Sequence, residues 1–426
     1  MKEQIRVPKL RFAEFSGKWE TKKLGLLCSK VGSGSTPYGG QEVYQQTGVP
    51  FIRSQNVINN ELILDNTHIP EAINSKMKGS IVKSNDILLN ITGASIGRSC
   101  VVPKDFKTGN VNQHVSIIRL KQDEPKFVQS FLASYRGQKL ILRGQTGSGR
   151  EGLNFQSIRG FKISIPPPSE QQKIASFLSA VDKKITQLQQ KKGLLENYKK
   201  GVMQLIFSQE LRFTREDGTA YPDWEEKKFK DIYSFYSTNS FSRDKLNYES
   251  GIVMNVHYGD IHTKFSTLFD INDELVPYIN KEVDLSKIKK DSYLKLGDLL
   301  IADASEDYND IGKTIEVVNL NDEKVISGLH TFHARPNKHK MALGFSGYLL
   351  QSWMIRKQVM KIAQGTKVLG ISTGRLAEIK FFIPSYEEQS QIAKFLSAID
   401  RKIAVVQTQI AQSQTFKKGL LQQLFV

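Results

Sequence analysis

The chain has 426 residues, which is too long for one ordinary hydrophobic core, so we expect more than one domain. Its 60 lysines and arginines exceed its 43 aspartates and glutamates and give a net charge of +17, which indicates a polyanionic partner, nucleic acid before an anionic membrane. With two cysteines and no apolar run of about 18 residues, the sequence excludes a disulfide framework and a membrane-spanning helix, and we expect a cytoplasmic protein.

Two related segments precede the two globular parts of the chain, and we call them lead-in segments. The first reads PKLRFAEFSGKWE and begins at Pro8, and the second reads LRFTREDGTAYPDWE and begins at Leu211. Both contain the tripeptide LRF and a Trp-Glu pair, which align Arg11 with Arg212 and Trp19 with Trp224. A match of this kind indicates that one unit occurs twice.

Each globular part is a series of short apolar and β-branched runs broken by turn residues, with one longer amphipathic stretch. When the two globular parts are aligned, residues 302–305 (ADAS) correspond to residues 91–94 (ITGA). We expect strands within residues 49–57, 86–92, 115–120 and 160–166 and a helix over 125–142, then strands within 251–261, 297–303, 313–318 and 378–384 and a helix over 347–363.

A segment of 40 residues after each globular part is duplicated with a constant shift of 218 positions. Residues 169–208 and 387–426 share 17 identical pairs, whereas unrelated segments would share about two or three. Apolar residues recur on a heptad in both copies, which predicts two long helices that need a partner. The heptad positions are Ile174, Val181, Leu188, Leu195 and Val202 with Leu178, Ile185 and Ile206, then Ile392, Ile399, Val406 and Leu420 with Leu396, Ile403, Ile410 and Leu424.

We expect the two helices to pack on each other as an antiparallel coiled coil, because the second globular part must connect the end of one helix to the start of the other. The opening residues 8–12 would then lie beside the end of the second helix. Lysines interrupt the apolar heptad at positions 192, 199 and 417, and we expect them to extend into water.

The fold class that follows is α+β: two β-rich domains joined by two long antiparallel helices, with an internal pseudo-twofold duplication. We place a lead-in segment and the first domain at residues 1–168 and the first long helix at 169–208. The second lead-in segment and domain occupy 209–386, and the second long helix occupies 387–426.

With these residues in view, the chain resembles the DNA specificity subunit of Type I restriction-modification systems. The resemblance covers nearly the whole chain and includes the IPxPxEQQxIAxFLxxxD-like signature at 165–182, repeated at 383–400. It also includes the endings YKKGVMQLIF and FKKGLLQQLF, the string DWEEKKF in the second lead-in segment, and the strings GSGSTP and NITGASIG in the first globular part. The second globular part departs from this pattern, since it has no evident NITG string.

The resemblance implies two target recognition domains that each read one half of a split double-stranded DNA site, and helices that set the gap between the halves. It also implies that methylation subunits dock on the long helices, carry S-adenosylmethionine and modify adenine. Restriction subunits, which hold the motor and the nuclease, join the full complex. No cofactor is expected in this chain.

The sequence contains no recognisable catalytic set: it lacks an NPPY-like or DPPY-like methyltransferase loop, a strand-borne GxGxxG and a P-loop. Pro222-Asp223 with Glu225–Lys227 is too compact for a nuclease metal site, and we interpret it as a turn. The second globular part holds five histidines without the close spacing that zinc requires, so we predict no metal site: His257, His262, His330, His333 and His339. The alternatives are a nuclease or methyltransferase acting alone, and a coiled-coil scaffold that binds RNA or an anionic membrane.

Candidate DNA-binding residues are polar side chains in loops, because base readout needs donors and acceptors that reach a groove edge. In the first globular part they are Ser33, Ser35, Thr36, Tyr38, Arg53, Gln55, Asn56, Thr92, Arg98, Asn112, Gln113, His114, Thr146, Ser148 and Arg150. In the second they are Thr238, Ser240, Arg243, His257, Tyr258, Asp303, Ser305, His330 and Lys367.

Overall fold

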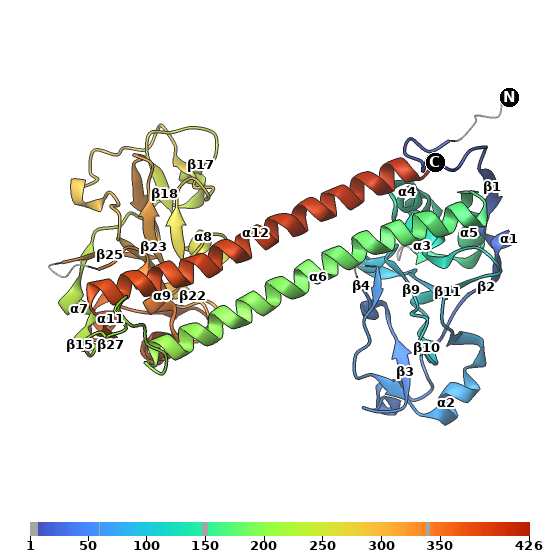
Figure 1. Cartoon of the computed structure of the whole chain (residues 1–426), viewed down its shortest axis with the longest axis horizontal. Coiled ribbons are helices and arrows are strands. Elements are labelled where there is room, and N and C mark those ends of the chain that lie inside the picture. Colours follow the sequence, from blue (N-terminus) through green and yellow to red (C-terminus); the bar gives the residue numbers. More distant parts are fainter. Residues whose placement is uncertain (1–6, 59, 147–151, 338–340) are drawn as a thin grey trace. The chain divides into compact units, whose positions relative to one another are not determined.

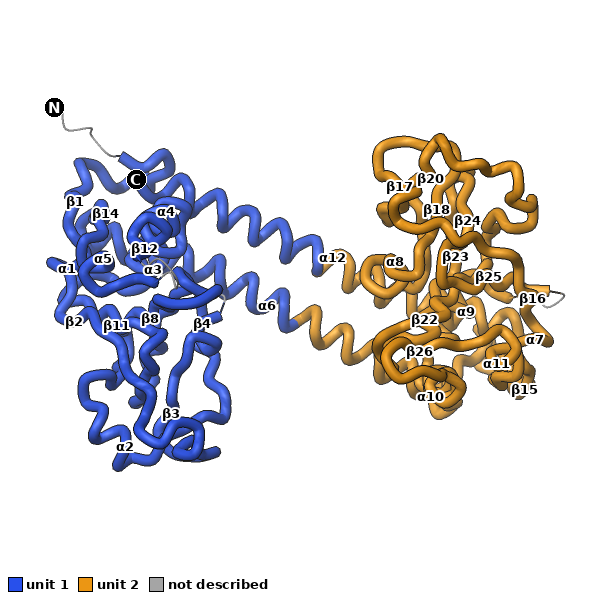
Figure 2. Tube along the Cα trace, turned by 180° about the vertical axis from the view of Figure 1, so that it is seen from behind, with its two compact units in different colours: residues 1–190, 407–426 blue, residues 191–406 orange. Residues whose placement is uncertain are grey.

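A computed structural model of the chain describes residues 7–58, 60–146, 152–337 and 341–426 (Figure 1). Its internal contacts define two compact units: unit 1 contains residues 1–190 and 407–426, and unit 2 contains residues 191–406 (Figure 2). Both dividing lines fall inside a long helix, either α6 (Pro168–Phe207) or α12 (Tyr386–Leu424). Each unit therefore consists of one globular head and a part of both long helices, whereas the sequence-based limits treat each helix as a separate segment.

The head of unit 1, called head 1, precedes α6 and is built mainly of short strands. Its helices are α1 (Leu24–Leu27), α2 (Glu71–Lys76), α3 (Pro125–Ala133), α4 (Tyr135–Gly144) and α5 (Phe155–Gly160). Its strands are β1 (Glu20–Lys23), β2 (Cys28–Ser33), β3 (Val49–Ile52), β4 (Val57–Ile58), β5 (Glu61–Leu62), β6 (His68–Ile69), β7 (Ile81–Val82), β8 (Ile87–Asn90), β9 (Ser99–Val101), β10 (Gly109–Val111), β11 (Val115–Leu120), β12 (Gln145–Thr146), β13 (Gly152–Leu153) and β14 (Lys162–Ile165).

The head of unit 2, called head 2, lies between α6 and α12 in the sequence. Its helices are α7 (Phe229–Ile232), α8 (Tyr258–Thr263), α9 (Phe345–Gln351), α10 (Trp353–Ile362) and α11 (Thr373–Ala377). Its strands are β15 (Glu225–Lys228), β16 (Tyr233–Tyr236), β17 (Leu246–Asn247), β18 (Met254–Val256), β19 (Leu268–Asp270), β20 (Tyr278–Ile279), β21 (Leu299–Ala302), β22 (Ala304–Ser305), β23 (Thr314–Asn319), β24 (Val325–Ser327), β25 (Thr331–Pro336), β26 (Leu369–Gly370) and β27 (Lys380–Ile383).

The two heads share one sheet layout, as the internal duplication predicts. Head 1 has an antiparallel sheet in the order β2-β11-β8-β9, and head 2 has the corresponding antiparallel order β16-β25-β21-β23 with one additional strand, β19, that pairs parallel to β23. A second sheet in each head contains a parallel pair, β3 with β10 and β18 with β24. A two-stranded ribbon precedes each long helix, in which Glu20 pairs with Ile165 and Glu225 pairs with Ile383.

Some expected elements end earlier than predicted, because polar side chains close local turns. The strand expected over 49–57 ends at Ile52, since the Asn56 amide oxygen accepts the Arg53 N–H at 2.8 Å and holds a short 3₁₀ turn. The helix expected over 125–142 breaks at Ser134, whose hydroxyl accepts the Gly137 N–H and starts α4. The strand expected over 251–261 becomes α8 at Tyr258.

The heptad residues of the long helices form the apolar contacts between helix and helix and between helix and head. In each unit, the parts of α6 and α12 lie side by side and run in opposite directions (Figures 1 and 2). In unit 1, Ile174 and Leu178 share a core with Leu420 and Leu424. The corresponding core of unit 2 contains Val202 and Ile206 of α6 with Ile392 and Leu396 of α12. The predicted antiparallel packing is thus confirmed within each unit.

The expectation that the heptad lysines extend into water is wrong for two of them. Lys199 Nζ lies 2.6 and 2.8 Å from the two carboxylate oxygens of Asp400 on the facing helix. Lys417 pairs in the same way with Asp182, 218 positions before Asp400. Each of these lysines lies beside the apolar contact with a carboxylate as its ion-pair partner. The pairing occurs once in each unit.

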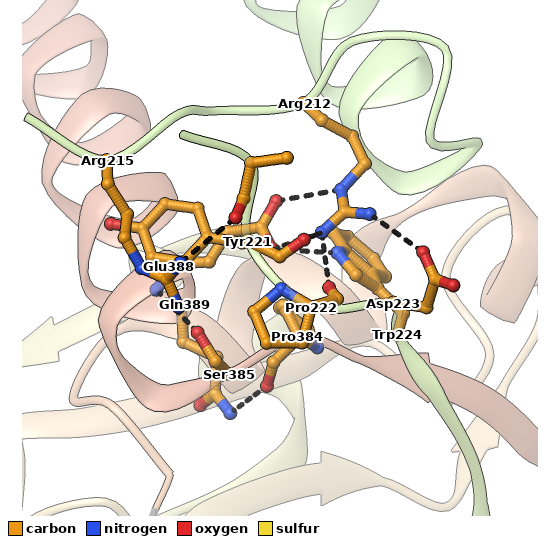
Figure 3. Close-up of polar contacts among 11 residues, drawn as sticks. Arg212, Arg215, Tyr221, Pro222, Asp223, Trp224, Pro384, Ser385, Glu388 and Gln389 are labelled. Atoms are coloured by element: carbon orange, nitrogen blue, oxygen red, sulfur yellow. Dashed lines mark hydrogen bonds and ion pairs between the residues drawn. The ribbon is translucent and has the colours of Figure 1, made fainter. Parts of the chain in front are cut away.

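A buried carboxylate joins lead-in segment, head and helix in both units, and Figure 3 shows the one in unit 2. The Arg212 guanidinium donates to both oxygens of Glu388 at 3.1 and 2.8 Å, and Trp224 Nε1 donates to the same carboxylate at 3.1 Å. Glu388 is fully buried in the first turn of α12. We call this group the carboxylate clamp.

The clamp of unit 1 uses the equivalent residues. Arg11 donates to both oxygens of Glu170 at 2.7 Å, and Trp19 Nε1 donates to Glu170 at 3.3 Å. The next residue of each helix, Gln171 or Gln389, is also buried. Its side-chain amide forms hydrogen bonds with backbone groups of the head. The Glu-Gln pair of the repeated signature therefore fastens each helix to its head.

The opening residues lie beside the end of α12, as the antiparallel arrangement predicts. The Leu10 N–H donates to the Gln423 carbonyl at 3.1 Å in unit 1. In unit 2 the Leu211 N–H donates to the Leu205 carbonyl at 3.0 Å, and Leu205 is the equivalent of Gln423. In unit 2 the lead-in segment continues directly from the end of α6. In unit 1 the lead-in segment that begins at Pro8 takes the equivalent place beside the end of α12.

Removing the cation of a clamp should destabilise its unit strongly. Arg212→Ala leaves the buried Glu388 carboxylate without its charge partner, so we expect a loss of about 3–5 kcal/mol in the free energy of unfolding. Lys281→Ala, which removes an exposed cation of the same unit, is the matched control and should change stability by less than about 0.5 kcal/mol. Urea denaturation measures both, and equal stabilities would contradict the role of the clamp.

Candidate nucleic-acid interface

Four of the head 1 candidates meet at the strand ends around His114. Thr36 Oγ1 donates to Gln113 Oε1 at 2.9 Å, and Gln113 Nε2 lies 3.2 Å from His114 Nε2. On the other side of the ring, the Thr92 hydroxyl bonds His114 Nδ1. These residues follow β2, β8 and β10, so three loops that are distant in the sequence supply one connected polar group.

A second cluster in head 1 gathers around Asp65, which the sequence prediction missed. Arg53 Nη2 donates to Asp65 Oδ2 at 2.7 Å, and Gln55 Nε2 donates to the same oxygen at 2.9 Å. Burial opposes ionisation of Asp65, but the hydrogen bonds from Thr67, Arg53 and Gln55 outweigh it and lower the pKa of this carboxyl. The acid therefore stays charged and fixes the direction of the Arg53 side chain.

Other head 1 candidates take different positions. Asn56 and Asn112 are buried, and their amide oxygens accept the N–H groups of Arg53 and His114, so these two residues shape the loops and are not exposed for readout. Ser33 is half-buried at the end of β2. The side chains of Ser35, Tyr38, Arg98 and Thr146 are exposed. Ser148 and Arg150 lie outside the described residues.

In head 2, several candidates gather around the ring of His330. Asp303 Oδ1 lies 3.2 Å from His330 Nδ1, and the Tyr258 ring packs edge-on against the His330 ring at 5.3 Å. The His257 ring lies 4.7 Å from Tyr258. Thr238 and Ser240 line, together with Asp303 and His330, an open pocket of about 580 Å³. Burial raises the pKa of Asp303, and His330 opposes this.

Arg243 is fixed by an acid that the sequence prediction missed. Both terminal nitrogens of its guanidinium donate to the buried Asp260 carboxylate at 2.8 Å, and Lys264 Nζ adds a contact at 2.9 Å. Asp65 and Asp260 have the same effect in the two heads, since each orients an arginine that the sequence singled out. The remaining candidates differ: Ser305 is buried and caps the Asp307 N–H, while Lys367 is exposed.

His257 is a neutral imidazole at pH 7, because burial and the nearby Arg243 charge lower its pKa to about 4. Its Nδ1 accepts the Gly259 N–H at 3.2 Å, which requires the unprotonated form of that nitrogen. His257 therefore offers hydrogen bonding and ring contact and contributes no positive charge to the site.

Backbone hydrogen bonds show which candidates are equivalent in the two heads. The Ile91 N–H donates to the His114 carbonyl at 3.0 Å, and the Asp303 N–H donates to the His330 carbonyl at 3.1 Å. His114 and His330 therefore correspond, and Asp303 corresponds to Ile91. The sequence alignment placed Ala302 opposite Ile91 and was therefore shifted by one residue. The two loops share too few residues to fix their alignment.

The described residues contain no group of three or more His, Cys, Asp and Glu side chains placed to hold a metal ion. Cys28 and Cys100 are buried free thiols, and burial raises the pKa of each to about 12, so neither is a thiolate at pH 7. In the same described part of the chain, no helix is both long enough and apolar enough to cross a membrane.

The protein contains two heads with related sheets. Each head has polar loops at its strand ends and is clamped to the first turn of one long helix. These features define a duplicated recognition protein. A family model described as the Type I restriction modification DNA specificity domain matches residues 16–197 and 221–413. The chain therefore belongs to the family of type I restriction-modification specificity subunits and carries the domain of that family twice. The family and fold class predicted from the sequence are confirmed.

Two relatives of similar sequence agree with this family assignment. The type I restriction enzyme MjaVIII specificity subunit of Methanocaldococcus jannaschii is 27% identical over 357 residues, which are 81% of this chain and 79% of that protein. The putative type I restriction enzyme MjaX specificity subunit of the same organism is 29% identical over 230 residues, 53% of this chain and 51% of that protein.

Solved structures share the fold. The type I restriction-modification S subunit from M. genitalium has a TM-score of 0.58 at 14% identity, with 99% of both chains covered. A chain from a structural study of complex assembly and conformational transition in the type I R-M system has a TM-score of 0.54 at 15% identity, with 95% of this chain and 96% of that chain covered.

The neutral state of His257 can be measured directly. Its ring should titrate with a midpoint near pH 4 in an NMR titration of histidine-labelled protein, with His257→Asn used to assign the signal. Because the folded pKa lies below the unfolded value of about 6.5, the stability gained from the neutral ring is complete above pH 6.5 and is lost as the pH falls toward 4. A midpoint at pH 6 or above would show that the ring is not desolvated.

Proposed function

We propose that this chain selects a bipartite double-stranded DNA sequence, with each head reading one half-site, and directs partner subunits to it. The observation that carries the proposal is the pair of heads with one layout and different side chains at equivalent positions, such as Ile91 and Asp303. A constant frame with variable polar loops is what two different half-sites require. The chain itself is a binding subunit and supplies no catalytic group.

The charge of the chain supports binding to DNA. A net charge of +17 provides a sequence-independent attraction to phosphates, while the ordered loops supply donors and acceptors for bases. The acids beside Arg53 and Arg243 hold the guanidinium groups in defined directions.

The partners that fit the proposal are methylation subunits docked on the long helices, with restriction subunits joining the full complex. In unit 2, α6 presents the exposed side chains Leu194, Tyr198 and Leu205, whose spacing places them along one helix face. In unit 1, α12 presents Phe416, the equivalent of Tyr198, with 55% of its surface exposed. S-adenosylmethionine would be held by the methylation subunit, where it would supply the methyl group for adenine.

The function is tested by expressing the chain with a methylation subunit and mapping methylated bases in the DNA of the host. We expect methylated adenines in one motif of two specified halves separated by an unspecified gap. The purified chain alone should neither methylate nor cleave DNA. An unsplit motif, or activity of the chain alone, would contradict the proposal and favour a stand-alone enzyme.

The affinity of the chain for nonspecific duplex DNA should fall steeply with salt, because binding releases counterions. With about six phosphate contacts, the association constant should fall by about 10³-fold between 50 and 200 mM salt. Fluorescence anisotropy with a labelled duplex measures this, and a duplex RNA of the same sequence is the control. A flat salt dependence would contradict phosphate contacts, and equal affinity for RNA would favour the RNA-binding scaffold.

A further inference from the structure

The open pocket of head 2 contains an acid–histidine pair that has no counterpart in head 1. Seventeen residues line its volume of about 580 Å³, and Asp303, His330 and Lys289 matter most for its chemistry. The side chain of Asp303 is 23% exposed and that of His330 is 51% exposed, so both reach the surface of the pocket. Solvent access of this degree allows contact with a ligand.

Backbone hydrogen bonds hold Asp303 on both sides, and among the described residues one of its carboxylate oxygens has no partner. Its N–H donates to the His330 carbonyl at 3.1 Å, and its carbonyl accepts the Ile371 N–H at 3.0 Å. Oδ1 bonds the His330 ring, whereas the part of the chain that the structure describes gives Oδ2 no hydrogen-bond donor. This oxygen can therefore accept a hydrogen bond from outside the protein.

His330 is fixed beside Asp303 in an unusual backbone conformation. Its φ is +54°, in the left-handed region that few residues other than glycine adopt, and such positions cluster at functional sites. Nδ1 is directed at Asp303, and the Tyr258 ring supports the imidazole from the side. Because Asp303 engages Nδ1, Nε2 is the ring nitrogen left to face a ligand.

The Asp303 carboxylate thus offers a hydrogen-bond acceptor to a ligand, and the His330 ring lies beside it. In the major groove, cytosine N4 and adenine N6 are exocyclic amino groups that donate hydrogen bonds, whereas guanine and thymine present only acceptors. A carboxylate in the site also repels phosphate, so a backbone contact at this position is unfavourable. Lys287 and Lys289 line the same pocket and can bind the phosphates beside the base.

We propose that Asp303 and His330 read the exocyclic amino group of one cytosine or adenine in the half-site bound by head 2. This inference rests on the proposed function and names the base chemistry that one of its sites recognises. In head 1 the equivalent position holds the apolar Ile91, and the Thr92 hydroxyl occupies His114 Nδ1. The two heads therefore recognise different base groups at corresponding positions.

The test selects bound sequences from a randomised duplex library with the full chain in complex with its methylation subunit. Asp303→Asn replaces one acceptor by an amide that also donates, and His330→Asn removes the ring while tolerating the left-handed backbone. Glu306→Gln, an exposed charge change three residues from Asp303, is the matched control. Thermal unfolding of each variant shows whether it folds.

We expect both pocket variants to lose preference at one position of one half-site by at least about fivefold, with every other position unchanged. The base pair whose preference is lost identifies the amino group, which is cytosine N4 in a G·C pair and adenine N6 in an A·T pair. The control variant should select the wild-type motif. If Asp303→Asn does not fold, His330→Asn decides the outcome.

An unchanged motif from a folded pocket variant would overturn this proposal while leaving the proposed function intact. If the wild-type complex selects no sequence at all, the proposed function itself is wrong, and this inference is overturned with it.

Discussion

The structure depends on one buried ionic interaction that occurs twice, the carboxylate clamp. A carboxylate removed from water is very unfavourable unless it is paired, so Glu170 and Glu388 can be buried only when their arginine and tryptophan partners arrive. Those partners lie on the lead-in segments, more than 150 residues away in the chain. The clamp therefore makes the lead-in segment, the head and the first turn of the long helix form together.

The two units differ in how the chain completes them. Unit 2 is built from one continuous segment, residues 191–406, whereas unit 1 combines residues 1–190 with the last twenty residues of the chain. Phe425 lies against Phe127 and Phe131 of head 1, with ring centres 5.3 and 5.9 Å apart. The core of unit 1 therefore contains residues from two segments that are distant in the sequence, and Phe425 belongs to it.

The features that follow from periodicity were predictable from the sequence. The shift of 218 positions and the heptads gave the duplication, the long helices and their antiparallel packing within each unit. Strands such as β11 were recognisable because an apolar run of strand length lay between turn residues. The family followed from the strings at the helix starts, and the structure explains these strings, since Glu388 and Gln389 fasten helix to head.

What the sequence could not show depends on contacts between distant loops. Lys199 and Lys417 look like exceptions to a heptad, and only the facing helix reveals the aspartates that compensate them. Asp65 and Asp260 were missed because an acid in a loop of a basic protein carries no signal of its role until its arginine is placed beside it. The candidates for base readout were chosen by residue type, and the direct role of each in DNA binding remains a prediction.

The central claim is that the two heads read DNA independently within a common frame. The most direct measurement replaces residues 19–166 with the first head of another member of the family and maps the methylated motif in the presence of the methylation subunit. The exchange replaces the polar loops of head 1. It leaves Glu170 and the long helices unchanged, and Trp19 is retained. The account predicts a new sequence in one half-site and an unchanged sequence in the other. A change in both half-sites would contradict it.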